Sequence, residues 1–351
     1  MNTISCSSLV YDDPLCFART SFPFYHSQKP SLIHCVPDFT LTLAAPVIAY
    51  WCLSLFFHAL DISGWKWLER YRIHDSEEAQ ARNLATRSEV VWAVILQQVI
   101  QTALGLITLS DESKHVVNHA QELRRVAFFV DSLAFAVFGE HITPRVLVHA
   151  TNFLYWWGVP MLQFFGAAYE QLPLICIKLF ILTSRLILDT WQYFIHRLMH
   201  VNKFLYKQIH SWHHRLYVPY AFGSLYNHPL EALFLDSMGA LVAEWATGMN
   251  NRQAMLLFTF STMKTVDDHC GYSLPWDPLQ WLTGNNADYH DIHHQVCDIL
   301  RLWFIYIADI LPKAIGIKSN FSQPFFVHWD ALLGTRMTRE DIERRQKNKA
   351  Q

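Results

Sequence analysis

Histidine is concentrated in three short stretches of this sequence: HRLMH at 196–200, HSWHH at 210–214 and HDIHH at 290–294. On a helix, positions three and four residues apart share a face, so each stretch would present its imidazoles together. Neutral imidazole is a ligand for iron, copper or zinc. The stretches therefore predict a metal centre. Its predicted ligands and catalytic residues are His196, His200, His210, His213, His214, His290, His293 and His294.

The residue patterns of these stretches exclude some classes of metalloprotein. The zinc-peptidase pattern H-E-x-x-H is absent, and the E-x-x-H pattern of soluble di-iron proteins occurs only once, at 112–115. A site of eight or more imidazoles suits two irons that bind and reduce O₂ to attack an unactivated C–H bond. We therefore expect an O₂-dependent di-iron oxidoreductase. A non-catalytic membrane metal-binding or transport protein is the alternative, although transporters usually place polar ligands within their spans.

The composition is that of a membrane protein. The 351 residues are 52% apolar, 15% aromatic and 17% charged, which is more apolar and less charged than a soluble domain. Long apolar runs occupy 36–60, 90–109, 146–168 and 172–188, and about 20 apolar residues suffice to cross a bilayer. Three glutamines, Gln97, Gln98 and Gln101, are out of place in the second run. The predicted fold is an all-α integral membrane protein, with about four transmembrane helices capped by a cytosolic helical His-rich di-metal domain.

Charge and cysteine content limit the partners and the compartment. A net charge of −2 with dispersed basic residues speaks against nucleic acid. The seven cysteines form no C-x-x-C pair, which favours a reducing compartment. The ending KNKAQ has the lysine spacing of a dilysine signal for retrieval to the endoplasmic reticulum. Residues 110–145 carry nearly as many basic residues as residues 61–89, so the positive-inside tendency alone leaves the orientation open.

Longer stretches around the histidines carry a resemblance. HRLYVPYAFGSLYNHPLEA at 214–232, STMKTVDDHCGYSLPWDPLQW at 261–281 and GIKSNFSQPFFVHWDALLGT at 316–335 resemble the fatty acid hydroxylase superfamily, and within it the sphinganine C4-monooxygenase branch. The resemblance implies a di-iron membrane enzyme of the endoplasmic reticulum with its histidines facing the cytosol. Its implied reaction is hydroxylation of carbon 4 of sphinganine or dihydroceramide. Electrons would come from NAD(P)H through cytochrome b5 or its reductase.

The same resemblance adds site residues and leaves alternatives open. It implies that His269 is a further ligand and that His228 is either a ligand or a residue that orients one. Asp189 and Asp291 are expected to accept hydrogen bonds from ligand imidazoles, with a salt bridge as the alternative for Asp189. A sterol C4-methyl oxidase, an acyl 2-hydroxylase or a lipid desaturase would use the same ligands. Candidates for lining a substrate tunnel are Phe222, Tyr226, Trp276 and Phe325.

The expected organisation is an N-terminal tail (1–35), a transmembrane region (36–190), a catalytic region (191–336) and a basic C-terminal tail (337–351). One segment departs from the family pattern. About twenty residues, 296–315, separate the third histidine stretch from Gly316, where relatives have one or two. The segment is interpreted as a retained intron or gene-model error, with a genuine lineage-specific helix as the alternative. Because it follows His294 so closely, we expect that it displaces His293 and His294 and impairs the chain.

Overall fold

The computed structural model describes residues 31–109, 119–158, 184–247, 249–295 and 319–350. This part of the chain is helical, and its extended pairing is confined to two isolated bridges. The elements are α1 (Asp38–Ile62), α2 (Lys66–Glu69), α3 (Ser76–Arg82), α4 (Arg87–Thr108), α5 (His119–Phe138), α6 (Pro144–Phe153), η3 (Leu154–Gly158), α9 (Ser184–Val201), α10 (Lys203–Gln208), η4 (His210–Arg215), η5 (Ala221–Leu225), α11 (Pro229–Glu231), η6 (Ala232–Ser237), α12 (Met238–Thr247), α13 (Asn251–Asp268), α14 (Pro278–Leu282), α16 (His328–Leu332) and α17 (Arg339–Ala350). Residues 287–295 are also helical. The predicted all-helical class is confirmed for the described residues.

Helices α1 and α4 are long and apolar enough to cross a membrane, with 25 and 22 residues. Helix α4 begins with a capping box, in which the Thr86 and Glu89 side chains each accept the other residue's backbone N–H. Only 17% of the most apolar 18-residue stretch of α1 is buried, and 28% of that of α4. The core helix of a soluble protein would be mostly buried, so these exposed apolar faces favour contact with lipid.

The described residues thus contain two candidate spans, where the sequence predicted about four. The predicted span at 146–168 begins in α6 and η3, but its remainder lies outside the described residues. The predicted span at 172–188 is described only from Ser184, in α9. The N-terminal tail up to residue 30 and the segment 296–315 also lie outside the described residues.

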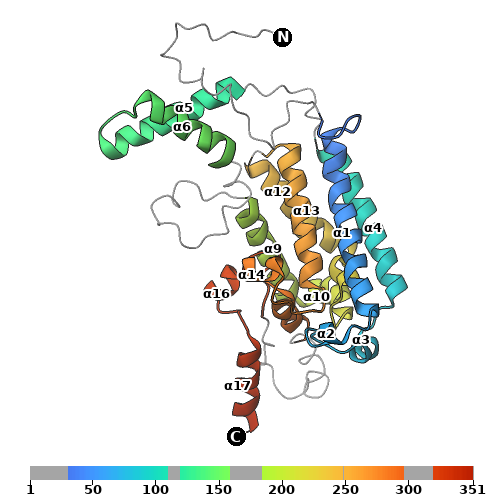
Figure 1. Ribbon diagram of the computed structural model, residues 1–351. Coiled ribbons are helices and arrows are strands. Elements are labelled where there is room, and N and C mark those ends of the chain that lie inside the picture. The colour runs from blue at the N-terminus through green and yellow to red at the C-terminus, as the bar shows by residue number, and fades with distance from the viewer. Residues whose placement is uncertain (1–30, 110–118, 159–183, 248, 296–318, 351) are drawn as a thin grey trace.

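The two candidate spans belong to a bundle with helices from the second half of the chain. Helix α1 packs along α13, and α9 packs on α12 (Figure 1). The Thr42 hydroxyl donates to the Asn251 carbonyl over 2.8 Å, which joins the first turns of α1 and α13. A Cβ added to Gly105 of α4 would lie 2.2 Å from the Leu43 side chain of α1. Glycine at this position therefore allows α1 and α4 to approach closely.

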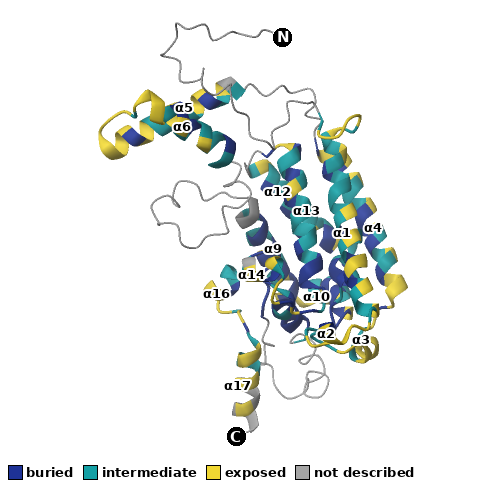
Figure 2. Cartoon of the chain, in the orientation of Figure 1, coloured by how far each residue is buried: buried dark blue, intermediate teal, exposed yellow. Residues whose placement is uncertain are grey.

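The segment between α1 and α4 covers the end of the bundle where the histidines lie. The Ile73 N–H donates to the Gly271 carbonyl over 2.9 Å, and the Leu84 N–H donates to the Arg215 carbonyl over 2.8 Å. The Asn83 side chain both donates to and accepts from the Val218 backbone. Buried residues gather around the lower part of α9, whereas the outer faces of α1 and α4 include many exposed residues (Figure 2).

Candidate metal centre

Helix α9 carries the first histidine pair on its buried face. His196 and His200 lie one turn apart and are 0% and 2% exposed. The Nδ1 atom of His196 lies 2.8 Å from the Phe321 carbonyl oxygen. Because a carbonyl only accepts, Nδ1 carries the proton. The lone pair of His196 Nε2 therefore points inward, toward His200 Nε2 at 3.2 Å.

The other two stretches each divide between two groups of histidines. In HSWHH, the i and i+4 residues, His210 and His214, join the first group, and the i+3 residue joins the second. HDIHH does the reverse: its i and i+4 residues join the second group and its i+3 residue joins the first. On a helix, positions i+3 and i+4 lie on either side of position i, so adjacent histidines can face two neighbouring sites. The local structure differs, however, because HSWHH forms the 3₁₀-helix η4 rather than an α-helix.

The first group contains five buried histidines whose ligand atoms all lie within 4.8 Å of one another. His200 Nε2 lies 2.8 Å from His210 Nε2 and 3.1 Å from His293 Nε2. The Nδ1 atom of His293 donates outward to the Ser319 carbonyl over 2.8 Å. The members of this group are His196, His200, His210, His214 and His293.

The second group contains four buried histidines under the same distance limit: His213, His269, His290 and His294. His290 Nε2 lies 2.9 Å from His269 Nε2 and 3.1 Å from His294 Nε2. The two groups adjoin, because the ring centroid of His294 lies 4.9 Å from that of His214 in the first group. The arrangement therefore provides two neighbouring sites rather than one.

The nine imidazoles fit a pair of metal ions. Burial lowers the pKa of every one of them, to about 3 for His210 and about 4 for His213 and His293. They are therefore neutral, the form that binds metal. Inward lone pairs about 3 Å apart repel one another unless a cation lies between them. Outward Nδ1–H groups bonded to carbonyls are the usual way in which ligand imidazoles are oriented.

His228 is not brought into either group. It precedes α11, and its Nδ1 accepts the Leu230 N–H over 3.2 Å.

Asp189 accepts the N–H groups of Phe325 and Phe326, at 3.3 and 2.9 Å. It thereby holds the segment that precedes α16 against α9.

Asp291 does contact an imidazole, but that imidazole belongs to His74, in the segment between α1 and α4. Its Oδ1 lies 2.9 Å from His74 Nε2, and its Oδ2 lies 2.9 Å from Arg339 Nη2 of α17. The residue therefore ties the third histidine stretch to two distant segments. The sequence predicted a histidine partner for Asp291, and the partner in the structure lies outside both metal groups.

Glu231 contacts the first histidine group directly, and sequence reasoning did not single it out. Its Oε1 lies 2.6 Å from His210 Nδ1, and both side chains are 1% exposed. Burial raises the pKa of Glu231 to about 7. The only signal in the sequence is its place in NHPLE, within one of the family-like stretches.

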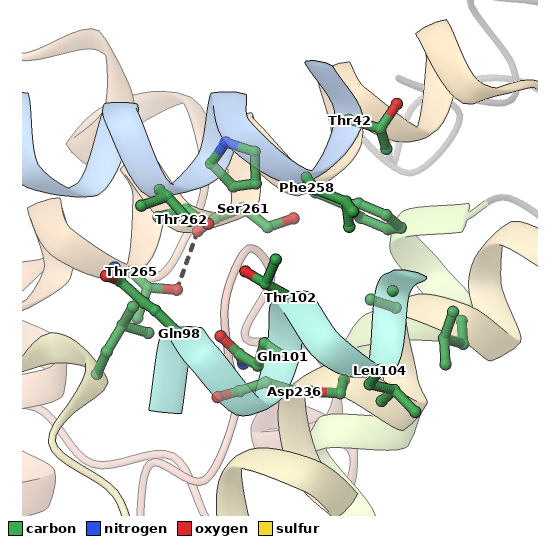
Figure 3. A pocket seen from close by; sticks show the side chains of 18 of the residues that line it. Thr42, Gln98, Gln101, Thr102, Leu104, Asp236, Phe258, Ser261, Thr262 and Thr265 are labelled. Carbon is green, nitrogen blue, oxygen red and sulfur yellow. Dashed lines mark hydrogen bonds between the residues drawn. The ribbon is translucent and has the colours of Figure 1, made fainter. Parts of the chain in front are cut away.

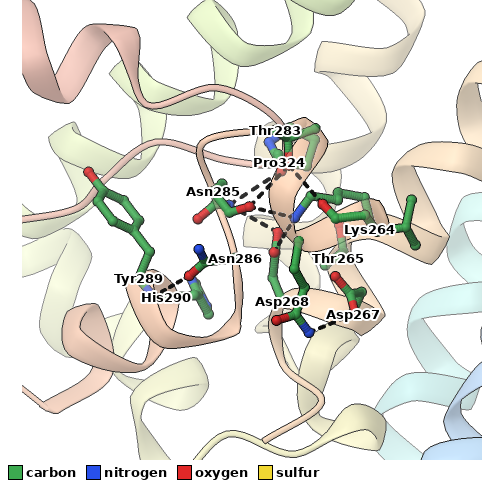
Figure 4. A network of polar contacts seen from close by, with 12 residues as sticks. Lys264, Thr265, Asp267, Asp268, Thr283, Asn285, Asn286, Tyr289, His290 and Pro324 are labelled. Carbon is green, nitrogen blue, oxygen red and sulfur yellow. Dashed lines mark hydrogen bonds and ion pairs between the residues drawn. The ribbon is translucent and has the colours of Figure 1, made fainter. Parts of the chain in front are cut away.

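A buried polar network supports the second group (Figure 4). Lys264 Nζ contacts Asp268 Oδ1 and donates to the Asn285 carbonyl at 3.0 Å, while Asn285 Nδ2 donates to Asp268 Oδ2 at 3.0 Å. Asp268 immediately precedes His269, and Asn285 precedes the helical residues 287–295. The network therefore fixes the end of α13 relative to the third histidine stretch.

A cavity of about 170 Å³ lies between α1, α4 and α13 (Figure 3). Its lining on α4 runs from Gln98 to Thr108, a rise of roughly 15 Å for a helix. Leu43, Leu104 and Phe258 are among its apolar lining, and Gln98, Gln192, Asp236 and Thr265 lie toward the histidine end.

A second cavity, of about 20 Å³, continues from the first. It shares Gln192, Asp236 and Thr265 with the larger cavity and is also lined by His210, His213 and His269. The larger cavity therefore leads to the metal centre. Four aromatic residues proposed from the sequence as tunnel lining belong to neither cavity: Phe222, Tyr226, Trp276 and Phe325. Phe222 packs near Trp51 instead, and Phe325 stacks on Phe260.

The chain is similar in sequence to one protein family and to several characterised proteins. The model of the fatty acid hydroxylase family matches residues 181–335. A sphingolipid C4-hydroxylase of Saccharomyces cerevisiae is 41% identical over 95% of this chain and 85% of its own length. Sphinganine C4-monooxygenase 1 of Arabidopsis thaliana is 37% identical over 86% of this chain and 89% of its own length. A very-long-chain aldehyde decarbonylase of Oryza sativa is 36% identical over 89% of this chain and 93% of its own length. No solved structure matches the chain.

Proposed function

This chain belongs to the fatty acid hydroxylase family, and on that premise we propose that it hydroxylates carbon 4 of sphinganine or dihydroceramide. The observation that carries the proposal is the pair of adjoining groups of buried, neutral histidines. The net reaction consumes O₂, two electrons and two protons, replaces a C–H bond by C–OH, and releases one water.

The nine grouped histidines are the proposed ligands of two iron ions. Bound iron would supply the binding and reduction of O₂ that an unactivated C–H bond requires. Outward hydrogen bonds of His196, His210 and His293 fix the direction of their Nε2 lone pairs. Burial of all nine excludes bulk water from the reacting atoms.

The cavity beside the centre would hold the substrate. Its apolar part lies between the candidate spans and α13, where an alkyl chain can enter from the bilayer. Its polar end adjoins His210, His213 and His269. A long-chain base bound in this direction would place its first carbons, and not its methyl end, at the metal centre.

The proposed location is the endoplasmic reticulum membrane, with the histidine end in the cytosol. The segment after α1 carries Lys66, Arg70 and Arg82 and packs at the histidine end. Loop charge alone leaves the orientation open, because residues 110–145 are nearly as basic. The dilysine-type spacing of KNKAQ supports the proposed orientation, since such signals act in the cytosol. The C-terminal helix α17 reaches the same end through Arg339, which contacts Asp288 and Asp291. Cytochrome b5 or its reductase is the proposed electron donor on that side.

The test is turnover by purified protein in lipid nanodiscs, with iron, NADPH, cytochrome b5, its reductase and ¹⁸O₂. We expect sphinganine to give a C4-hydroxylated base that carries one ¹⁸O atom. The rice relative's name makes aldehyde decarbonylation the second candidate. A long-chain aldehyde supplied to the same preparation should remain unchanged. Alkane formation from it, with no oxygenation of sphinganine, would reverse the assignment.

A further inference from the structure

The histidine end of the larger cavity is lined by buried polar atoms without hydrogen-bond partners. These include Gln98 Nε2, Gln192 Oε1 and Ser261 Oγ, and in the smaller cavity Ser224 Oγ and Glu231 Oε2. Leaving a buried polar group unpaired is unfavourable, because the group loses its hydrogen bonds to water without gaining others. Several unpaired donors and acceptors beside one connected space fit a ligand that carries several polar groups of its own.

Asp236 lies where the two cavities meet. Its carboxylate accepts from Gln97 Nε2 at 3.4 Å and from Gln192 Nε2 at 3.2 Å. No lysine or arginine within the described residues forms an ion pair with it. Figure 3 shows Asp236 with Gln98 and Gln101 on the side of α4, across the cavity from Ser261 and Thr262 of α13.

The electrostatics of this position favour a cationic ligand. Burial, with the nearby Glu231 carboxylate, raises the pKa of Asp236 to about 7. An ionised carboxylate in such surroundings is poorly solvated and lacks a counterion, so a cation placed beside it would stabilise the charged form. The neutral amides of Gln97 and Gln192 orient the carboxylate but do not balance its charge.

A free long-chain base has the matching chemistry. It carries an ammonium group on carbon 2 and hydroxyls on carbons 1 and 3, and its alkyl chain continues beyond carbon 4. An ammonium held between the two cavities leaves the hydroxyls for the unpaired amide and hydroxyl groups. It also leaves the alkyl chain in the apolar cavity and carbon 4, two carbons from the amine, next to the cavity of His210, His213 and His269.

We propose that Asp236 binds the ammonium group of the substrate and makes the enzyme selective for the free base over its N-acylated form. The proposal rests on the proposed function of this site. In dihydroceramide the same nitrogen is an uncharged amide. Replacing the carboxylate therefore affects the free base much more than dihydroceramide.

The experiment compares wild type, Asp236→Asn and the exposed-charge control Glu77→Gln in nanodiscs, with iron content measured for each. Sphinganine and dihydroceramide are supplied separately. For D236N we expect kcat/KM for sphinganine to fall about 10- to 100-fold, mainly through KM, as for loss of a buried charge-assisted contact. Turnover of dihydroceramide should change less than threefold, and E77Q should match wild type on both substrates. An equal loss on both substrates, or no loss on either, would overturn the proposal.

Wild-type protein provides a second test that does not depend on the folding of the variant. Octadecylamine and octadecanol share a chain, but only the amine is cationic. The amine should inhibit sphinganine hydroxylation at a concentration at least tenfold lower than the alcohol does, and equal inhibition would contradict the role of Asp236. Failure of wild type to hydroxylate sphinganine at all would instead refute the proposed function.

Discussion

The His210 imidazole and the Glu231 carboxylate form a 2.6 Å hydrogen bond, with both side chains 1% exposed. The bond joins the first histidine group to α11 and thereby to η6, which carries Asp236. A single contact thus connects the proposed metal centre with the polar end of the cavity.

Glu231→Gln should lower activity and iron affinity about 10- to 100-fold, the usual effect of removing a partner that orients a ligand imidazole. Iron content and turnover of the purified variant are the measurements. Glu77→Gln, which removes an exposed carboxylate, is the matched control. Full iron content and activity in E231Q would show that His210 needs no such partner.

His213→Ala and His228→Ala should differ sharply. His213 belongs to the second group and is 4% exposed, so its loss should abolish hydroxylation and lower bound iron while the protein remains inserted. His228 lies outside both groups, and its loss removes a helix-capping contact worth about 1 kcal/mol. We expect H228A to keep its iron and most of its activity. Loss of iron in H228A would contradict this prediction and indicate that His228 is a metal ligand.

Lys264→Met should destabilise the protein by about 3–5 kcal/mol, because it leaves the buried Asp268 without its cation. The double variant Lys264→Met, Asp268→Leu should recover part of this loss, since replacing both partners removes the unpaired charge. Denaturant unfolding of both variants in the same detergent measures the difference. Equal destabilisation of the two would mean that the ion pair itself contributes little.

The sequence led us to expect that residues 296–315 displace His293 and His294, but the structure keeps both histidines in the two groups, so the segment should be dispensable for the chemistry. In the chain as written, His293 lies in the first group, His294 lies in the second, and His293 Nδ1 still reaches the Ser319 carbonyl beyond the segment. We therefore expect comparable activity with and without the segment. An inactive full chain beside an active deletion variant would support the retained-intron interpretation, and transcript reads that skip 296–315 would establish it.

The spacing of histidines brought out eight of the nine residues that the structure groups, because periodicity determines which side chains share a face, whereas His269 came from the family resemblance. It did not indicate that each H-x-x-H-H stretch serves both groups, which depends on how α9, η4 and residues 287–295 meet in space. Glu231 was missed because a single carboxylate has no distinctive spacing.

The glutamines of α4 are residues whose role the sequence left unexplained and the structure explains. In the sequence they were polar residues in an otherwise apolar run. Gln97 contacts Asp236, whereas Gln98 and Gln101 line the cavity. Polar residues in an otherwise apolar span thus marked an internal polar site. The aromatic residues proposed as tunnel lining did not stand out from their sequence surroundings in this way, and they line neither cavity.

The most direct test of the central claim is mass spectrometry of sphingoid bases from cells that lack their own 4-hydroxylase and express this chain. Wild type should produce phytosphingosine at the expense of sphinganine, and H213A, present at the same level in the membrane, should produce none. Phytosphingosine from H213A, or none from an iron-loaded wild type with or without residues 296–315, would contradict the account.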